Sequence, residues 1–293
     1  MKSTNDVRSI DGFLLLYFYQ LEENLNNNNY DLNSIKFQSE ESNTDEFLKV
    51  FFKKYIEKNK SIKNCDFSEV SFVINDFKKS FETKNLFRFI ITEVFLPEDL
   101  TKKQKINISK NKSSVYTNPD LYLKIKNGDD TYYESVELKS TKNNHIPGSS
   151  IQQVLPFEWV IFIKRDKKPK VTTGYYINTI TNKLPFPDRS PRPQIGFKNL
   201  EINNTQNRVI LNNSLVLKSD NFNNIKKLEL INDWQEFLTN EWMEIIKSDN
   251  PKRNEKWFNN SLRKFSVKLI DHIDNSSEEE KINLINKLKK LIK

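Results

Sequence analysis

Residues 118–140 read NPDLYLKIKNGDDTYYESVELKS. Apolar and polar side chains alternate over residues 121–126, which is typical of a strand with one buried face. Residues 127–130 read NGDD, a strong hairpin-turn signal, and a second strand is expected over residues 131–140. This stretch therefore predicts a β-hairpin within a small sheet.

The hairpin is expected to gather three charged side chains. Alternate residues of a strand point to opposite faces, so if the apolar residues of both strands face the core, Asp120, Glu137 and Lys139 share the other face. A four-residue loop pairs Lys126 with Thr131 and places Asp120 directly across from Glu137, with side chains about 5 Å apart. A two-residue loop makes the two acids diagonal neighbours at about 7–8 Å. Either register leaves room for one metal site.

Two carboxylates this close repel each other, and hard oxygen ligands that face water suit Mg²⁺, which keeps several of its own waters. An ion held there can polarise a phosphodiester and lower the pKa of a bound water. Lys139 is expected to orient the attacking water or to neutralise charge on the phosphate. The alternative is a surface hairpin with charged residues on its wet face. The proline before Asp120, the hairpin and the matched parity favour catalysis.

These residues also carry a resemblance to a known family. Pro119-Asp120 together with Glu137-Leu138-Lys139 resembles the PD-(D/E)xK nuclease motif, in the form found in type II restriction endonucleases. The resemblance extends over roughly residues 85–200, where 149–154 resembles the short helix after the catalytic strand and 158–164 the next core strand. It implies an α/β fold, with a central mixed sheet flanked by helices.

The resemblance also implies functional roles. Asp120 and Glu137 are the expected Mg²⁺ ligands, and Lys139 is expected to serve the hydrolytic water. Some nucleases of this family add a glutamate from an upstream helix, for which Glu93 is the first candidate and Glu46 the second; an ordinary ion-paired or surface glutamate is the alternative. His145 lies in a polar loop and is expected to be solvated or to touch phosphate, with no role as a base.

Two further segments carry candidate DNA contacts. Gln152 and Gln153 have amides that could meet the DNA backbone or a base edge, or that could tie their helix to the catalytic strand. The proline-dense segment 184–194 is stiff and would preorganise Arg189 and Arg192 for phosphates or guanine, and Gln194 for adenine. A rigid surface connection with solvated arginines is the alternative.

Composition narrows the classes of function. The 47 basic and 39 acidic residues give a net charge of +8, which favours a polyanionic partner such as DNA, although AT-rich coding inflates lysine. Cys65 is the only cysteine and there are two histidines, too few for a disulfide framework, a zinc finger or a Cys-His triad. Five glycines leave little scope for a P-loop, so ATP is not expected. A reduced cytoplasm is expected, without membrane spans.

Three regions are expected along the chain. Residues 1–84 form a helical region on the core, with a buried helix around 13–19 and further helices at 46–57 and 69–81. Residues 85–200 form the catalytic core, with a strand at 171–180. Residues 201–293 are mainly helical and serve DNA binding or dimerisation, with apolar residues at helical spacing over 234–245 and 282–292.

The sequence thus predicts a type II restriction endonuclease that hydrolyses double-stranded DNA with Mg²⁺ at a short sequence. A homodimer is expected, because two nicks on a twofold-symmetric site need two active sites. A repair or junction nuclease with the same motif is one alternative. The other is a noncatalytic DNA-binding module on a nuclease-like scaffold.

Overall fold

The computed structural model describes residues 4–28, 32–35, 37, 41–42, 46–110, 120–153, 155–181, 192–219, 221–249 and 256–292. Asn118 and Pro119 of the predicted motif therefore lie outside the described residues, as does Arg189. The described residues up to Asn232 form one compact unit, and those from Asp233 onward form a second.

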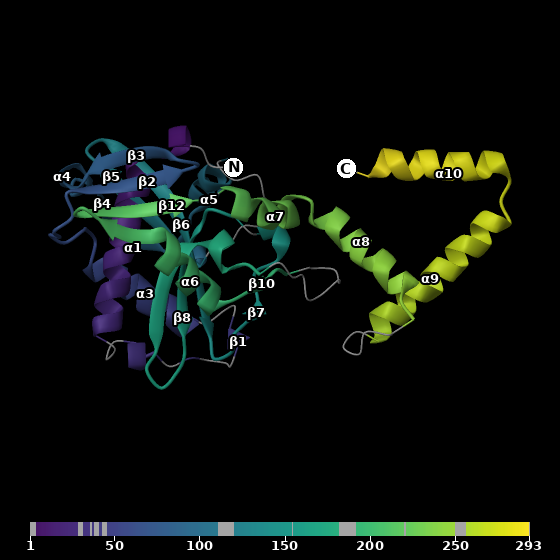
Figure 1. Cartoon of the computed structure of the whole chain (residues 1–293), viewed down its shortest axis with the longest axis horizontal. Helices are drawn as coiled ribbons and strands as arrows, with labels where there is room; N and C mark the ends of the chain where they lie inside the picture. The colour runs from purple at the N-terminus through teal and green to yellow at the C-terminus, as the bar shows by residue number, and fades with distance from the viewer. Residues whose placement is uncertain are drawn as a thin grey trace. The chain divides into compact units, whose positions relative to one another are not determined.

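A mixed sheet of six strands forms the centre of the first unit (Figure 1). Five strands run in the order β4 (Ile90–Phe95), β5 (Leu121–Asn127), β6 (Asp130–Thr141), β8 (Trp159–Lys164) and β9 (Lys170–Tyr175). Short β1 (Glu41–Ser42) pairs with the end of β6. Strands β6 and β8 are parallel and the other pairs are antiparallel, so the expected α/β fold with a mixed sheet is confirmed at this level.

The predicted hairpin is the β5–β6 pair. Its loop has two residues, Gly128 and Asp129, and Gly128 takes a φ of 60°, which glycine adopts without strain. The pairing Asn127–Asp130 continues the register of Lys126–Thr131. The expectation that a two-residue loop makes the acids diagonal was therefore wrong, because the shorter loop only adds one more pair to the same register.

Helix α1 (Ser9–Asn27) packs on one face of this sheet. Its apolar run, expected as a buried helix, contributes Phe13 and Phe18 to the main core, and the ring of Phe18 lies 4.9 Å from that of Trp159. The buried Glu22 accepts hydrogen bonds from Thr173 and from Arg208, which fixes α1 against β9.

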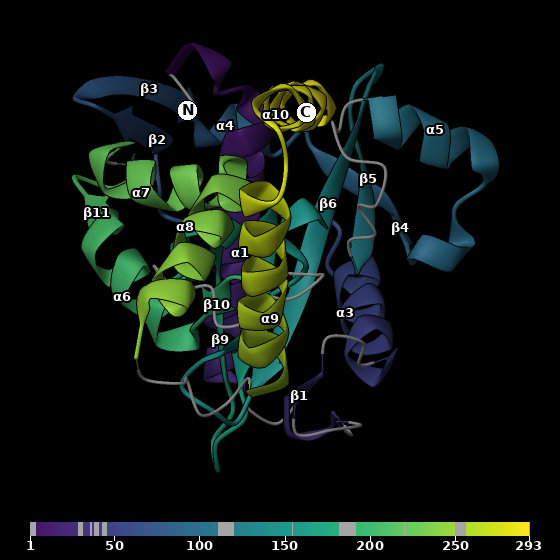
Figure 2. The same ribbon diagram turned by 90° about the vertical axis from the view of Figure 1, so that its right-hand side faces the viewer.

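The other face is covered in part by α6 (Phe197–Asn207). Phe197 packs against Phe162 of β8, with ring centroids 5.7 Å apart. A Cβ on Gly174 would lie 2.7 Å from Leu200, so glycine allows α6 to approach β9. Helix α3 (Glu46–Lys58), predicted over residues 46–57, contacts β4 (Figure 2).

A second sheet of four strands corrects the picture of residues 1–84 as helical. Its order is β11 (Arg208–Leu211), β12 (Ser214–Ser219), β2 (Glu69–Ile74) and β3 (Phe77–Glu82), with β12 and β2 parallel. The helix expected over 69–81 was wrong, because Val70, Phe72 and Ile74 are buried at a period of two. Asn75 and Asp76 both have positive φ, as a tight hairpin turn requires.

Short elements complete the first unit. The strand expected over 171–180 ends at Tyr175 and continues as the 3-10 helix η4 (Tyr176–Thr179). The short helix expected over 149–154 is the 3-10 turn η3 (Ile151–Gln153). The remaining elements are η1 (Thr4–Asp6), α4 (Thr83–Leu86), η2 (Pro97–Asp99), α5 (Lys102–Lys110), β7 (Ile146–Pro147), β10 (Gln194–Ile195) and α7 (Asn221–Asn232).

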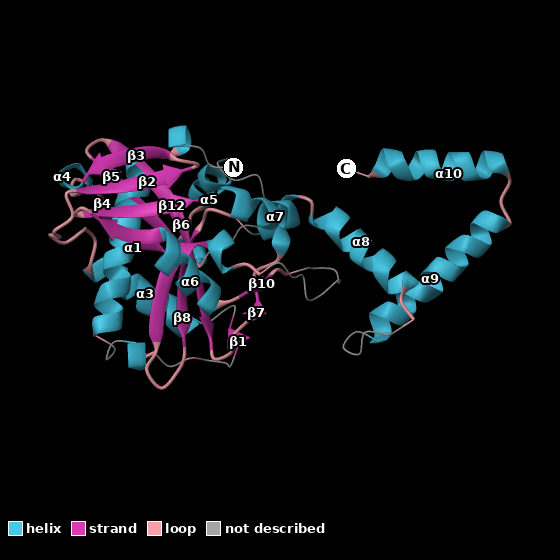
Figure 3. Ribbon diagram, in the orientation of Figure 1, coloured by secondary structure: helices cyan, strands magenta, loops and turns pink. Residues whose placement is uncertain are grey.

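The second unit contains the helices α8 (Trp234–Lys247), α9 (Lys256–Asp274) and α10 (Glu278–Leu291), as Figure 3 shows. Both predicted helical stretches are thus confirmed. Leu238 and Ile245 of α8 are buried, and Trp242 packs against Phe258 of α9, with ring centroids 5.8 Å apart. No helix in the described part of the chain is long and apolar enough to span a membrane.

Candidate active site

The structure brings Asp120, Glu137 and Lys139 together, and we call these three residues the charged cluster. Lys139 Nζ donates a hydrogen bond of 2.6 Å to Glu137 Oε1. Asp120 lies just before β5, and its Oδ2 accepts a hydrogen bond of 2.9 Å from the backbone N–H of Leu138. All three side chains are buried, and Lys139 is only 1% exposed. The parity argument therefore predicted correctly that the three side chains come together. The expectation that the carboxylates face water was wrong, because the cluster is buried.

Two neighbouring residues fix the position of Glu137. Ser149 Oγ donates to Glu137 Oε1 at 2.6 Å, and the backbone N–H of Ser149 donates to the hydroxyl of Tyr176 at 2.9 Å. Tyr176 is buried at the start of η4. A Cβ on Gly148 would lie 2.4 Å from that hydroxyl, so only glycine fits beside Ser149 without displacing Tyr176.

Helix α3 adds a cation to the cluster. Lys49 Nζ lies 3.6 Å from Asp120 Oδ1 and 3.3 Å from Glu46 Oε1. The carboxyl group of Glu46 is thereby linked to that of Asp120 through one lysine. Glu46 is at the exposed start of α3, whereas Lys49 is largely covered.

Burial controls the protonation of this cluster. Burial first, and then the nearby charge of Glu137, raises the pKa of Asp120 to about 7. Burial alone would lower the pKa of Lys139, but Glu137, Tyr176 and Asp120 outweigh it, so this pKa lies above its usual value. Burial also raises the pKa of Tyr176, to about 12, although the charge of Lys139 opposes the rise. Lys139 therefore stays protonated at neutral pH.

The donor set fits a hard divalent cation with few protein ligands. Asp120 and Glu137 supply carboxylate oxygens. Burial first, and the charge of Glu137 second, disfavour the ionised form of Asp120, and a bound cation would favour it. Among the described residues, no three His, Cys, Asp or Glu side chains form a metal-binding group. Mg²⁺ is often held by only one or two carboxylates, with waters and phosphate oxygens completing its shell.

Glu93 lies away from the charged cluster. It is in β4 opposite Lys124, with which it forms an ion pair, and Lys124 is four residues along β5 from Asp120. Four residues of strand span about 13 Å. Of the two candidate accessory acids, the structure therefore places Glu46 nearer the cluster, against the order expected from the sequence.

The predicted DNA contacts are spread over different environments. Gln153 and Arg192 are exposed, and the side chain of Gln152 lies outside the described part of the structure. Gln194 Oε1 accepts a hydrogen bond from Thr181 at 3.0 Å, so this amide ties two chain segments together. His145 is exposed, in agreement with the expectation of a solvated loop residue.

Sequence reasoning missed Lys49 and Tyr176. Lys49 is 71 positions before Asp120, and nothing in its own segment distinguishes it from the other lysines of α3. Tyr176 was expected within a strand, whereas the 3-10 turn directs its hydroxyl to Ser149. Ser149 itself was expected only as part of the short helix over residues 149–154.

Comparisons with protein-family models, with curated proteins and with solved structures gave no match. The site is therefore interpreted from its own geometry and from the motif resemblance.

Proposed function

We propose that the chain is a Mg²⁺-dependent endonuclease of the type II restriction class, with a restriction endonuclease-like core, that hydrolyses double-stranded DNA at a short specific sequence. The observation that carries the proposal is the buried cluster in which two carboxylates and a lysine meet at the start of the β5–β6 pairing. The PD-(D/E)xK resemblance supports the same function.

The cluster's residues suit distinct roles. Asp120 and Glu137 would hold Mg²⁺, which when bound lowers the pKa of a water and stabilises charge on the phosphate. Ser149 and Lys139 both donate to Glu137 Oε1 and so fix the orientation of that carboxylate. Lys139 keeps its proton, so it offers a positive charge to the phosphate and a hydrogen-bond donor to the attacking water.

The charge of the molecule suits a polyanionic substrate. The net charge is +8, and Lys49 lies within the site itself. A homodimer would supply the second active site that a twofold-symmetric DNA sequence requires.

Plasmid digestion tests the proposal. Purified protein should convert plasmid DNA to discrete fragments with Mg²⁺, and EDTA should abolish cleavage. Asp120→Asn and Lys139→Met should each lose at least a hundredfold in cleavage rate while duplex binding is kept. Asp129→Asn, which removes the same charge from the exposed hairpin loop, should cleave normally.

The outcome separates the alternatives. Structure-dependent nicking would indicate a repair or junction nuclease, and cleavage without sequence preference would remove the restriction assignment. DNA binding without any Mg²⁺-dependent cleavage would contradict an enzyme and favour a DNA-binding module.

A further inference from the structure

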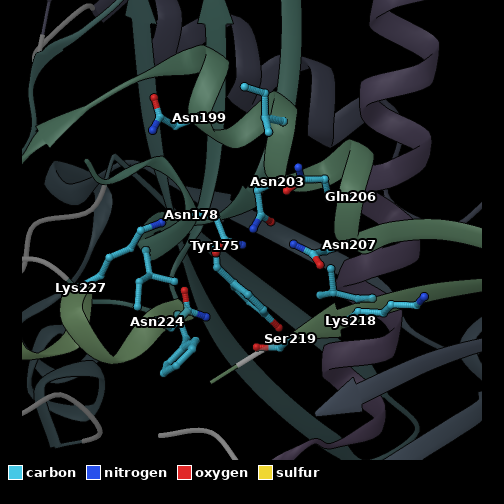
Figure 4. A pocket seen from close by; sticks show the side chains of 14 residues that line it. Tyr175, Asn178, Asn199, Asn203, Gln206, Asn207, Lys218, Ser219, Asn224 and Lys227 are labelled. Atoms are coloured by element: carbon cyan, nitrogen blue, oxygen red, sulfur yellow. The ribbon is translucent and has the colours of Figure 1, made fainter. Parts of the chain in front are cut away.

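A recess in the first unit contains none of the residues of the charged cluster. It has a volume of about 360 Å³, within the usual range of small-molecule sites, and lies among β9, η4, α6, β12 and α7 (Figure 4). We call it the amide pocket, because six of the residues that line it carry carboxamides: Asn178, Asn199, Asn203, Gln206, Asn207 and Asn224.

Helix α6 supplies four of these amides from one face. Asn199, Asn203, Gln206 and Asn207 are spaced by four, three and one residues, so they follow one side of the helix. Phe197 and Leu200 of the same helix are buried in the core. The helix thus presents four amides to the pocket, together with the exposed Ile202, while Phe197 and Leu200 anchor it in the core.

The opposite wall adds flat aromatic surface. Tyr175 and Phe157 both line the pocket, and their ring centroids lie 5.9 Å apart at an interplanar angle of 87°. Figure 4 shows Asn203 and Asn207 facing the ring of Tyr175 across the pocket. A planar ligand could stack on one ring while its edge meets the amides.

The charge of the lining favours an anion. It includes Lys218 and Lys227, and none of the described lining residues is acidic. The ammonium of Lys227 is directed toward the pocket interior (Figure 4), and burial lowers the pKa of this lysine. The described lining offers the ammonium of Lys227 no acidic side chain, and a bound anion would provide this negative charge.

One amide oxygen of the lining, that of Asn203, is placed to accept a hydrogen bond from a ligand. Asn203 Oδ1 is buried, and none of the described residues donates a hydrogen bond to it. A buried acceptor without a hydrogen bond lowers stability by about 1–3 kcal/mol. A hydrogen bond from a ligand N–H would recover this free energy.

We propose that the amide pocket binds a nucleotide, with its phosphate at Lys227, its base against Tyr175 and the edge of the base on the amides of α6. An aromatic surface for stacking, amides for the base edge and a cation for the phosphate are the features that recognise a base joined to a phosphate. Nucleotide binding here does not depend on DNA cleavage, because the pocket shares no residue with the charged cluster.

Isothermal titration calorimetry of the full chain tests this proposal. The probes are dAMP, dCMP, dGMP and dTMP, their nucleosides and inorganic phosphate. At least one monophosphate should bind one to one, at least tenfold more tightly than its nucleoside and than phosphate. Lys227→Met should weaken binding of that monophosphate at least tenfold without altering binding of the nucleoside. Asn203→Leu should weaken binding of both the monophosphate and the nucleoside. Gln206→Leu, at an exposed position, repeats this test if Asn203→Leu fails to fold.

Lys226→Met is the matched control, because Lys226 is the exposed neighbour of Lys227 on the same helix. The proposal is overturned if no monophosphate binds at 1 mM, or if the Lys226 and Lys227 variants behave alike. Competition between the bound monophosphate and a duplex oligonucleotide would identify the ligand as a nucleotide of DNA. Independent binding of the two would identify a free nucleotide.

Discussion

At the scale of single residues, Asp120 has an environment that disfavours its charge. It is buried beside Glu137, and only the backbone N–H of Leu138, together with the ammonium groups of Lys49 and Lys139, stabilises its ionised form. These favourable interactions do not offset burial, so the carboxyl group keeps its proton up to a pH of about 7. A divalent cation would have to displace that proton, which couples metal binding to pH in the neutral range.

Asp120→Asn tests this protonation through stability. The pKa of Asp120 is raised in the folded state, so between its ordinary value and about pH 7 the folded protein binds more protons than the unfolded chain. The contribution of Asp120 to stability is therefore greatest near pH 4 and is lost as pH rises to 7. Asparagine does not titrate, so between pH 5 and pH 8 the variant should gain on the order of 3 kcal/mol relative to wild type.

Chemical unfolding of both proteins in EDTA at the two pH values measures this gain. Titrating groups that do not interact with Asp120 act in both proteins and cancel in the comparison. Glu137, Lys139 and Lys49 interact with Asp120, so the difference reports the protonation of the cluster as a whole. Asp129→Asn serves as a control, because Asp129 is in the exposed hairpin loop. A stability difference between Asp120→Asn and wild type that stays constant from pH 5 to pH 8 would show that Asp120 ionises normally in the folded protein.

The charged cluster was predictable because it depends on local pattern alone. Asp120, Glu137 and Lys139 lie on two consecutive strands, and their parity follows from the apolar residues between them. Lys49 and Tyr176 come from other elements, and their approach depends on how α3 and η4 pack. The spacing of apolar residues along the sequence does not predict contacts between elements so far apart in the chain.

At the scale of elements, period and turn chemistry decide between helix and strand. The stretch 69–81 was assigned to a helix, yet its buried apolar residues recur every second position and Asn75-Asp76 forms its turn. Strand β2 also pairs with β12, which lies about 145 residues later in the chain, as in Ser214–Glu69. A partner so distant leaves no local signal, so the second sheet could not be predicted.

The loop that carries Ser149 depends on one glycine. The backbone N–H of Gly148 donates to Pro193 at 2.8 Å, and a methyl group there would meet both that carbonyl and the Tyr176 hydroxyl. Gly148→Ala should therefore lower the free energy of unfolding by about 1–3 kcal/mol, as overpacking commonly does. It should also slow the proposed cleavage, because Ser149 would no longer orient Glu137, while duplex binding is kept.

Tyr176→Phe provides the control for this steric argument. The substitution removes the oxygen that lies 2.4 Å from the added methyl position. Unfolding curves of both single variants and the double variant give the coupling between the two sites. Tyr176→Phe should cost less stability in the Gly148→Ala protein than in wild type, and strictly additive effects would refute the proposed clash.

At the scale of the whole molecule, the two compact units differ in how fully their apolar surface is covered. The first unit buries an extensive core around α1 and the central sheet. In the second unit, α10 has no buried residue, and its exposed aliphatic side chains are Ile282, Ile285, Leu288 and Leu291. Apolar faces of this kind on a helix usually pack against another helix.

The charges of α10 favour a second copy of the same helix as its partner. Its first turn carries Glu278, Glu279 and Glu280, and its last turn carries Lys289 and Lys290, so two antiparallel copies would place opposite charges side by side. We expect the wild-type chain to form a dimer. The double variant Ile285→Asp and Leu288→Asp places charges on the apolar face and should be a monomer. Asn283→Asp with Asn286→Asp adds the same charge to the polar face and should leave the dimer intact. Light scattering after size-exclusion chromatography measures the molar mass of the wild type and of the two double variants. A monomeric wild-type chain would contradict pairing through α10.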